Sequence, residues 1–121
     1  MFSLVVCVKR RADLSREEFS KHWRHVHGPL IASCPEFTRH LHSYTQYHLA
    51  DGDGDIAQLF GVSAKDYDGV AVLSFASPEA CDAAFKEPQY LEKVRPDEFN
   101  FVDTDGCMTF FTEPVFVVKP S

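Results

Sequence analysis

Apolar positions along the chain change their period several times, and each change predicts a different element. Residues 2–8 are continuously apolar and rich in β-branched side chains, which is typical of a strand covered on both faces. Residues 38–49 follow a period of two and predict a second strand with two chemically different faces. Residues 69–76 predict a third strand, and residues 107–118 a last one in which Pro114 marks a bulge or an edge.

Helical signals fall between these strands. Ser15 and Glu18 have the spacing of a capping box, so a helix is expected to begin there. Its buried stripe is predicted from apolar residues at helical spacing, namely Phe19, Trp23, Val26 and Leu30. Pro29 lacks an amide proton and is expected to end or kink this helix. Ser77 predicts the N-cap of a second helix, which Pro88 ends.

The remaining segments are predicted as connections. Residues 51–55 form a solvated acidic turn, and the stretch up to residue 65 a long loop with one helical turn at 57–60. Residues 89–95 are expected to form a short helix, and residues 96–106 an acidic loop.

The resulting order, β-α-β-β-α-β, is that of the ferredoxin-like unit. We therefore predict an α+β fold in which residues 1–121 form one domain, with both helices on one face of a four-stranded antiparallel sheet. The strands are largely apolar on both sides, so the bare face of the sheet should require a partner. A second copy packed face to face would give a homodimer.

Composition excludes several classes of protein. Twelve basic against 18 acidic residues give a net charge of −6, which argues against nucleic acid and anionic membranes as partners. No run of 18 apolar residues predicts a membrane-spanning helix. The first residues have the charge order opposite to that of a signal peptide, and none of the four cysteines forms a CxxC pair. We expect a cytoplasmic protein with reduced thiols.

Histidine is the most informative residue type, because all six lie between residues 22 and 48. A histidine can give or take a proton near pH 7. On the first helix, His27 and His22 flank the predicted apolar stripe, whereas His25 points away from it and is expected in solvent. His27 also lies near the helix C-terminus, where the dipole favours imidazolium. The alternative is that His27 only caps a carbonyl freed by Pro29.

One face of the second predicted strand is polar throughout: His40, His42, Tyr44, Gln46 and His48. If this face looks into the interior, it lines a cavity with hydrogen-bonding groups, which is the usual form of a small-molecule site. If it looks outward, it is an ordinary solvent face. We favour the cavity, and expect a substrate there to contact His22, Trp23, Gln46 and Asp68.

Carboxylates near the predicted cavity have two interpretations. Asp68, Asp97 and Glu98 could each pair with a histidine and raise its basicity, although a turn or a helix cap is the simpler interpretation. The acidic turn at 51–55 lacks the glycine and the final glutamate of a calcium loop. The histidines lack the spacing of a ligand set, and no nucleotide-binding or serine-hydrolase motif occurs. We therefore predict neither a metal nor a cofactor.

Three segments resemble the EthD-domain family. Residues 15–30, SREEFSKHWRHVHGPL, carry the capping Ser, E-E-F, an aromatic residue at Trp23, and His27 followed by Gly-Pro-Leu. The segment YDGVAVLSF at 67–75 is similar to the third strand of the family, and PDEFNFVD at 96–103 to an acidic segment of its fungal members.

The resemblance implies a dimeric α/β barrel and a functional role for His27, the histidine at the recurrent position. It does not imply one reaction. Fungal members often serve polyketide pathways, in which relatives decarboxylate or dehydrate aromatic intermediates. Other dimeric α/β-barrel proteins are cofactor-free oxygenases or cyclases of polyphenols.

Three functions follow from these patterns. The first is a cofactor-independent lyase, a decarboxylase or dehydratase, acting on an aromatic polyketide-type intermediate. In it, His27 would be the general acid/base, and His42, Tyr44 or His48 would hold the developing oxyanion. The second is a cofactor-free oxygenase of an anthrone-like polyphenol, and the third a non-enzymatic accessory protein that carries an apolar ligand.

Overall fold

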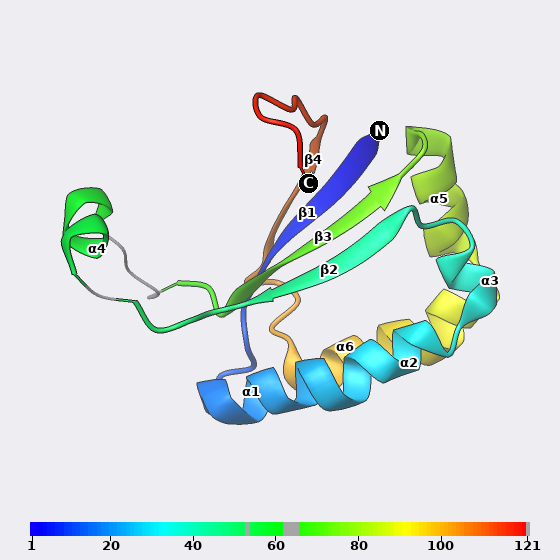
Figure 1. Cartoon of the computed structure of the whole chain (residues 1–121). Coiled ribbons are helices and arrows are strands. Elements are labelled where there is room, and N and C mark those ends of the chain that lie inside the picture. The colour runs from blue at the N-terminus through cyan, green and yellow to red at the C-terminus, as the bar shows by residue number, and fades with distance from the viewer. Residues whose placement is uncertain (53, 62–65, 121) are drawn as a thin grey trace.

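One antiparallel sheet with helices on one face makes up the molecule (Figure 1). The structure, a computed structural model, describes residues 1–52, 54–61 and 66–120. The strands are β1 (Phe2–Val8), β2 (Ser43–His48), β3 (Gly69–Phe75) and β4 (Met108–Thr112). Their order in the sheet is β2-β3-β1-β4, and every neighbouring pair is antiparallel. The predicted α+β sheet is therefore confirmed, although its second and last strands are shorter than the sequence pattern indicated.

The helical layer consists of two long helical runs that lie beneath the sheet (Figure 1). The first run joins α1 (Arg16–His22), the π-helical turn η1 (Trp23–His27) and α2 (Gly28–Ala32), and the short α3 (Pro35–Thr38) follows it. The second run contains α5 (Pro78–Lys86), the π-helical turn η2 (Tyr90–Val94) and α6 (Arg95–Phe101). Helix α4 (Asp55–Phe60) lies on the β2–β3 connection and projects away from the rest, at the left of Figure 1.

Both predicted helix starts are confirmed by their caps. The Ser15 hydroxyl accepts a hydrogen bond from the Glu18 amide at 3.1 Å, and the Glu18 carboxylate accepts one from the Ser15 amide at 2.9 Å. This reciprocal pair satisfies two amides that a helix N-terminus otherwise leaves without partners. At the start of α5, the Ser77 hydroxyl accepts from the Ala80 amide at 3.2 Å.

The buried stripe of the first helical run differs from the predicted one. Phe19, Trp23, His27 and Ile31 are buried at intervals of four residues, whereas Val26 is 48% exposed. On an ideal α-helix, four residues overshoot a full turn by about 40°, so such a series would drift around the axis. The wider turn η1, closed by the Gly28 amide on the Trp23 carbonyl, absorbs part of that drift. The predicted place of Val26 in the stripe is wrong because it assumes an α-helical period throughout.

A second π-helical turn overturns the predicted acidic loop. Residues 95–101 are helical, so Pro96 lies inside a helical run rather than at its end. The turn η2 comes directly before it, and the Arg95 amide bonds to the Tyr90 carbonyl five residues back. This wider bonding pattern accommodates a residue that has no amide proton and crowds the preceding turn. Asp97 and Glu98 consequently project from a helix.

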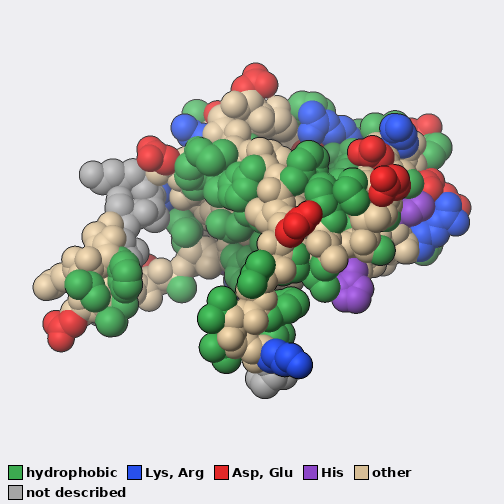
Figure 2. All heavy atoms as spheres, turned by 90° about the horizontal axis from the view of Figure 1, so that it is seen from above, with side chains coloured by type: hydrophobic (Ala, Val, Ile, Leu, Met, Phe, Trp, Pro, Cys, Tyr) green, Lys and Arg blue, Asp and Glu red, His purple; other side chains and the backbone are tan. Residues whose placement is uncertain are grey.

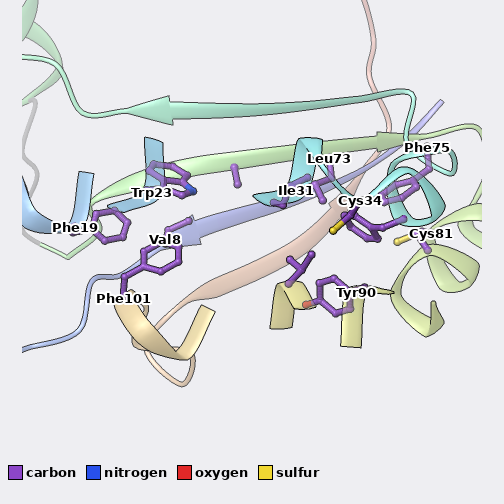
Figure 3. Packing of buried hydrophobic residues seen from close by; sticks show 14 residues of the cluster. Val8, Phe19, Trp23, Ile31, Cys34, Leu73, Phe75, Cys81, Tyr90 and Phe101 are labelled. Atoms are coloured by element: carbon purple, nitrogen blue, oxygen red, sulfur yellow. The ribbon is translucent and has the colours of Figure 1, made fainter. Parts of the chain in front are cut away.

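The core fills the space between the sheet and the helices (Figure 3). Leu4 of β1 pairs with Leu73 of β3, and Val6 pairs with Ala71, so these side chains face the helices together. Trp23, Phe19 and Phe101 gather at one end of this layer, and Tyr90, Phe75 and Cys81 at the other (Figure 3).

No helix among the described residues covers the opposite face of the sheet. Two rows across the strands are largely apolar: Thr45, Val72, Val5 and Phe110, then Tyr47, Val70, Cys7 and Met108. Three of these side chains are strongly exposed, Tyr47 at 56%, Met108 at 49% and Phe110 at 43%. Figure 2, seen from above the sheet, shows hydrophobic side chains gathered over it. A third row carries hydroxyl groups, and in it Ser3 and Ser74 bond to each other at 2.8 Å.

Candidate functional site

A cavity of about 240 Å³ lies between the helix-facing side of the sheet and the two helical runs. Its wall is mostly aliphatic and aromatic, with contributions from Trp23, Ile31, Phe37, Leu73, Phe85, Val94 and Phe101. A few polar side chains also line it, namely His27, Tyr44, Tyr90, Arg95, Glu98, Thr104 and Thr109. An apolar cavity with a few convergent polar groups is the usual form of a small-molecule site, and this volume suits a compact ligand.

His27 is the polar group with the most defined environment. The His27 residue is only 3% exposed, and its Nδ1 lies 2.8 Å from Oδ2 of Asp97. Because a carboxylate only accepts hydrogen bonds, Nδ1 carries the proton and donates it. In the neutral ring, Nε2 then holds a lone pair, and within the described part of the chain it has no hydrogen-bond partner. His27 therefore combines a fixed tautomer with a position in the cavity wall.

Asp97 is shared by two histidines. Its carboxylate accepts from His27, from His22 Nε2 at 3.0 and 3.2 Å, and from the Asn100 side-chain amide at 3.1 Å. Burial opposes ionisation, but the hydrogen bonds from Asn100, His27 and His22 outweigh it and lower the pKa of Asp97. The rings of both histidines pack on Phe101, with centroids 4.6 Å away for His22 and 4.9 Å for His27. The carboxylate thus stays charged and fixes the orientation of the His27 ring.

Tyr44 brings a phenol to the same cavity from strand β2. Burial raises the pKa of Tyr44 to about 12. The group therefore remains protonated over the physiological range and can donate a hydrogen bond to an oxygen that gains negative charge.

Three further polar side chains form a bonded group on another part of the wall. Tyr90 donates its hydroxyl hydrogen to Oε2 of Glu98 at 2.8 Å, and Arg95 donates from Nη1 to Oε1 of Glu98 at 2.7 Å. The Arg95 guanidinium also lies over the Phe99 ring, 4.8 Å from its centroid. Burial and the neighbouring Glu98 raise the pKa of Tyr90 well above its ordinary value. We name Tyr90, Arg95 and Glu98 the Glu98 group.

A model of one protein family matches most of this chain. The family model of the EthD domain matches residues 11–105, which include both helical runs and strands β2 and β3. The chain belongs to the EthD domain family. The resemblance inferred from the three sequence segments is thereby confirmed.

One relative of this EthD domain protein is similar in sequence, and two solved structures are similar in fold. Dehydratase aurZ of Gibberella zeae is 25% identical over 104 residues, which are 84% of this chain and 68% of that protein. An EthD family protein from Bacillus halodurans superposes with a TM-score of 0.66 at 11% identity, covering 95% of this chain and all of the other. A dimeric ferredoxin-like protein of unknown function from Thermobifida fusca gives 0.59 at 11% identity, with 92% and 88% covered. The fold is therefore ferredoxin-like.

The polar face predicted for the second strand of the EthD domain is only partly in the cavity. Tyr44 lines it, whereas His42 is exposed in the bend before β2. His40 lies farther away and bonds to Glu87 at 2.8 Å.

His48 and Gln46 lie beside the cavity, and both contact Trp23. Ser20 Oγ lies 2.8 Å from His48 Nδ1, His48 Nε2 lies 2.8 Å from Gln46 Oε1, and Gln46 donates to the Trp23 carbonyl at 2.9 Å. The His48 ring also packs against the Trp23 indole, at 4.4 Å between centroids. Burial, with a smaller effect of Arg24, lowers the pKa of His48. This chain of hydrogen bonds holds the carbonyl that closes turn η1.

Asp68 is placed away from the cavity wall. Its carboxylate accepts from the Arg10 amide at 3.0 Å and pairs with the Arg16 guanidinium at 3.1 Å. It therefore joins the end of β1 to the start of α1.

Sequence reasoning misses the importance of three positions in the second helical run, namely Tyr90, Arg95 and Asp97. It treats Asp97 only as one of three carboxylates that could pair with a histidine, and it does not single out Arg95 and Tyr90. An α6 helix predicted through Pro96 would have placed Asp97 and Asn100 one turn apart on the same side. No group of three or more His, Cys, Asp or Glu side chains that could hold a metal ion occurs among the described residues. No described helix is long and apolar enough to cross a membrane.

Proposed function

We propose that this EthD domain protein is a cofactor-independent lyase, a dehydratase, that acts on an aromatic polyketide-type β-hydroxy ketone. The observation that carries the proposal is the His27–Asp97 pair, a buried imidazole whose Nδ1 is bonded at 2.8 Å and whose Nε2 is left for a ligand in the cavity. Its likeness to dehydratase aurZ supports the choice of dehydration over decarboxylation.

Each residue has one step in this reaction. Nε2 of His27 takes a proton from the carbon between the ketone and the hydroxyl-bearing carbon. The ketone oxygen gains negative charge, and the protonated phenol of Tyr44 donates a hydrogen bond to it. The imidazolium, stabilised by Asp97, then returns its proton to the departing hydroxyl, which leaves as water. Loss of water leaves an enone. This becomes a phenol when the ring carbon next to the new double bond loses a proton and the ketone oxygen takes one up, so the aromatic phenol and one molecule of water are the products.

A two-ring β-hydroxy ketone, 3-hydroxy-1-tetralone, offers a direct assay because loss of water gives 1-naphthol, which is followed by its absorbance. We expect His27→Ala and His27→Gln to lower the rate by about 10²- to 10⁴-fold, because neither side chain can shuttle a proton. His40→Gln is the matched control, since His40 is also bonded to a carboxylate, Glu87, but lies outside the cavity.

The results distinguish the proposal from its alternatives. Near-wild-type rates in both His27 variants would refute general acid/base catalysis by this residue. Tight binding of the ketone without turnover would instead identify a carrier protein. Turnover of the substrate only in the presence of oxygen would identify an oxygenase.

We further propose that the protein is a homodimer that buries the bare face of its sheet. The exposed Tyr47, Met108 and Phe110 side chains on that face support this, because apolar patches of this kind mark interaction sites. The similar protein from Thermobifida fusca is described as dimeric.

A further inference from the structure

The Glu98 group takes no part in the proposed reaction, yet all three of its side chains line the cavity: the charged Arg95 and Glu98, and Tyr90. Tyr90 is 8% exposed, and the Glu98 side chain is 21% exposed. The Arg95 side chain is 44% exposed, so solvent reaches one side of this ion pair, while Glu98 is its more buried partner and has acceptor positions left. Each Glu98 oxygen accepts one hydrogen bond from a described residue, while a carboxylate offers about four acceptor positions.

Arg95 has unused capacity as well. A guanidinium has five N–H donors; that of Arg95 donates from Nη1 to Glu98 and also interacts with the Tyr90 hydroxyl, which leaves further donors open. A ligand that reaches this wall therefore meets open acceptor positions on Glu98 beside open donors on Arg95.

We propose that the Glu98 group binds a hydroxyl group on the ring of an aromatic ligand, so that the substrates of this cavity are phenols. A hydroxyl donates its hydrogen to Glu98 and accepts a hydrogen bond from Arg95 at the same time. An ether can only accept, so it brings no donor to the open acceptor positions of Glu98. A ligand carboxylate would be repelled by Glu98, whose charge already balances that of Arg95 at 2.7 Å. The inference rests on the proposed function for the site and the aromatic nature of the ligand.

Three inert two-ring probes test this, with affinities measured by isothermal titration calorimetry: 2-naphthol, 2-methoxynaphthalene and 2-naphthoate. The wild-type protein should bind 2-naphthol at least about tenfold more tightly than the methyl ether, because only the naphthol can donate a hydrogen bond to the charged Glu98 carboxylate. The naphthoate should bind most weakly. In Glu98→Gln, the advantage of the hydroxyl should fall to within about threefold, and the naphthoate should gain about tenfold because Arg95 loses its counter-ion.

Glu87→Gln is the matched control, because Glu87 also pairs with an arginine, Arg39 at 3.0 Å, but does not line the cavity. It should leave all three affinities unchanged. If Glu98→Gln does not fold, Arg95→Met serves instead, since it keeps an apolar stem near Phe99 and should further weaken naphthoate binding.

The outcomes separate this inference from the proposed function. Equal affinities of the wild-type protein for naphthol and its ether overturn the hydroxyl site and leave the proposed reaction standing. An undiminished preference in Glu98→Gln also overturns it. Failure of all three probes to bind overturns both, because the cavity is then not an aromatic site. Since no probe reacts, loss of catalysis in a His27 variant has no bearing on the result.

Discussion

Replacing Asp97 by asparagine removes the charge of the carboxylate to which His22, His27 and Asn100 all donate hydrogen bonds. The wild-type oxygens accept hydrogen bonds from all three at 2.8–3.2 Å, and the residue is 9% exposed. Asparagine keeps the shape but retains one acceptor oxygen, so its amide hydrogens face at least one former donor. We expect the free energy of unfolding at pH 7 to fall by about 2 kcal/mol, the value of one hydrogen bond to a buried charge.

The stability that ionised Asp97 contributes should depend on pH. Because the pKa of Asp97 is lower in the folded protein, its contribution is present above the unfolded pKa of about 3.9 and is lost as the pH falls through the folded value. The difference in stability between wild type and Asp97→Asn should therefore be largest at pH 7 and much smaller at pH 3.

Thermal and urea unfolding at both pH values measure the effect, and about 2 kcal/mol corresponds to a melting temperature lower by about 8 °C for a domain of this size. Asp105→Asn is the control, since it removes one negative charge at an exposed position. A difference of equal size at pH 7 and pH 3 would refute the reasoning, and so would an Asp97→Asn variant as stable as wild type at pH 7.

Two further predictions concern packing and assembly. In Gly69→Ala, the new Cβ would lie 2.5 Å from Cζ3 of Trp23 and 2.9 Å from the Tyr47 carbonyl oxygen. We therefore expect the free energy of unfolding, measured in urea, to fall by about 1–3 kcal/mol. Unchanged stability would contradict close packing of the Trp23 indole against Gly69. In Phe110→Glu, a charge enters the bare face of the sheet, and the variant should sediment as a monomer where the wild-type chain sediments as a dimer. A monomeric wild-type chain at micromolar concentration would refute the assembly.

The elements with strong local signals could be predicted from the sequence. The capping box at Ser15 and the apolar run of β1 depend on near neighbours in the chain, and both are found as predicted. The alternation around Tyr44 correctly assigned a strand, because a period of two matches side chains that point to opposite faces of a sheet in turn.

The site was harder to predict because it depends on contacts distant in sequence. His27 and Asp97 are 70 residues apart, and nothing in the local pattern joins them. His48 of β2 illustrates the same point, since it has the predicted register and still packs against Trp23 outside the cavity wall. Pro96 has the local pattern of a helix end, and a proline tolerated after a π-helical turn has no signature in the sequence alone.

The two π-helical turns make the arrangement sensitive to residue number as well as to residue type. Each turn holds one residue more than an α-helical turn; His27 is the last residue of η1, and η2 comes directly before α6, which carries Asp97. If either turn closed with ordinary α-helical bonding at unchanged residue number, everything after it would rotate by about 100°. A single deletion within residues 23–27 or 90–94 would instead restore α-helical bonding and leave the segment after the turn in place. Loss of one residue inside η2 therefore keeps Asp97 on the side that faces His27, whereas loss of one residue within α6 before Asp97 would turn the carboxylate away from the histidine.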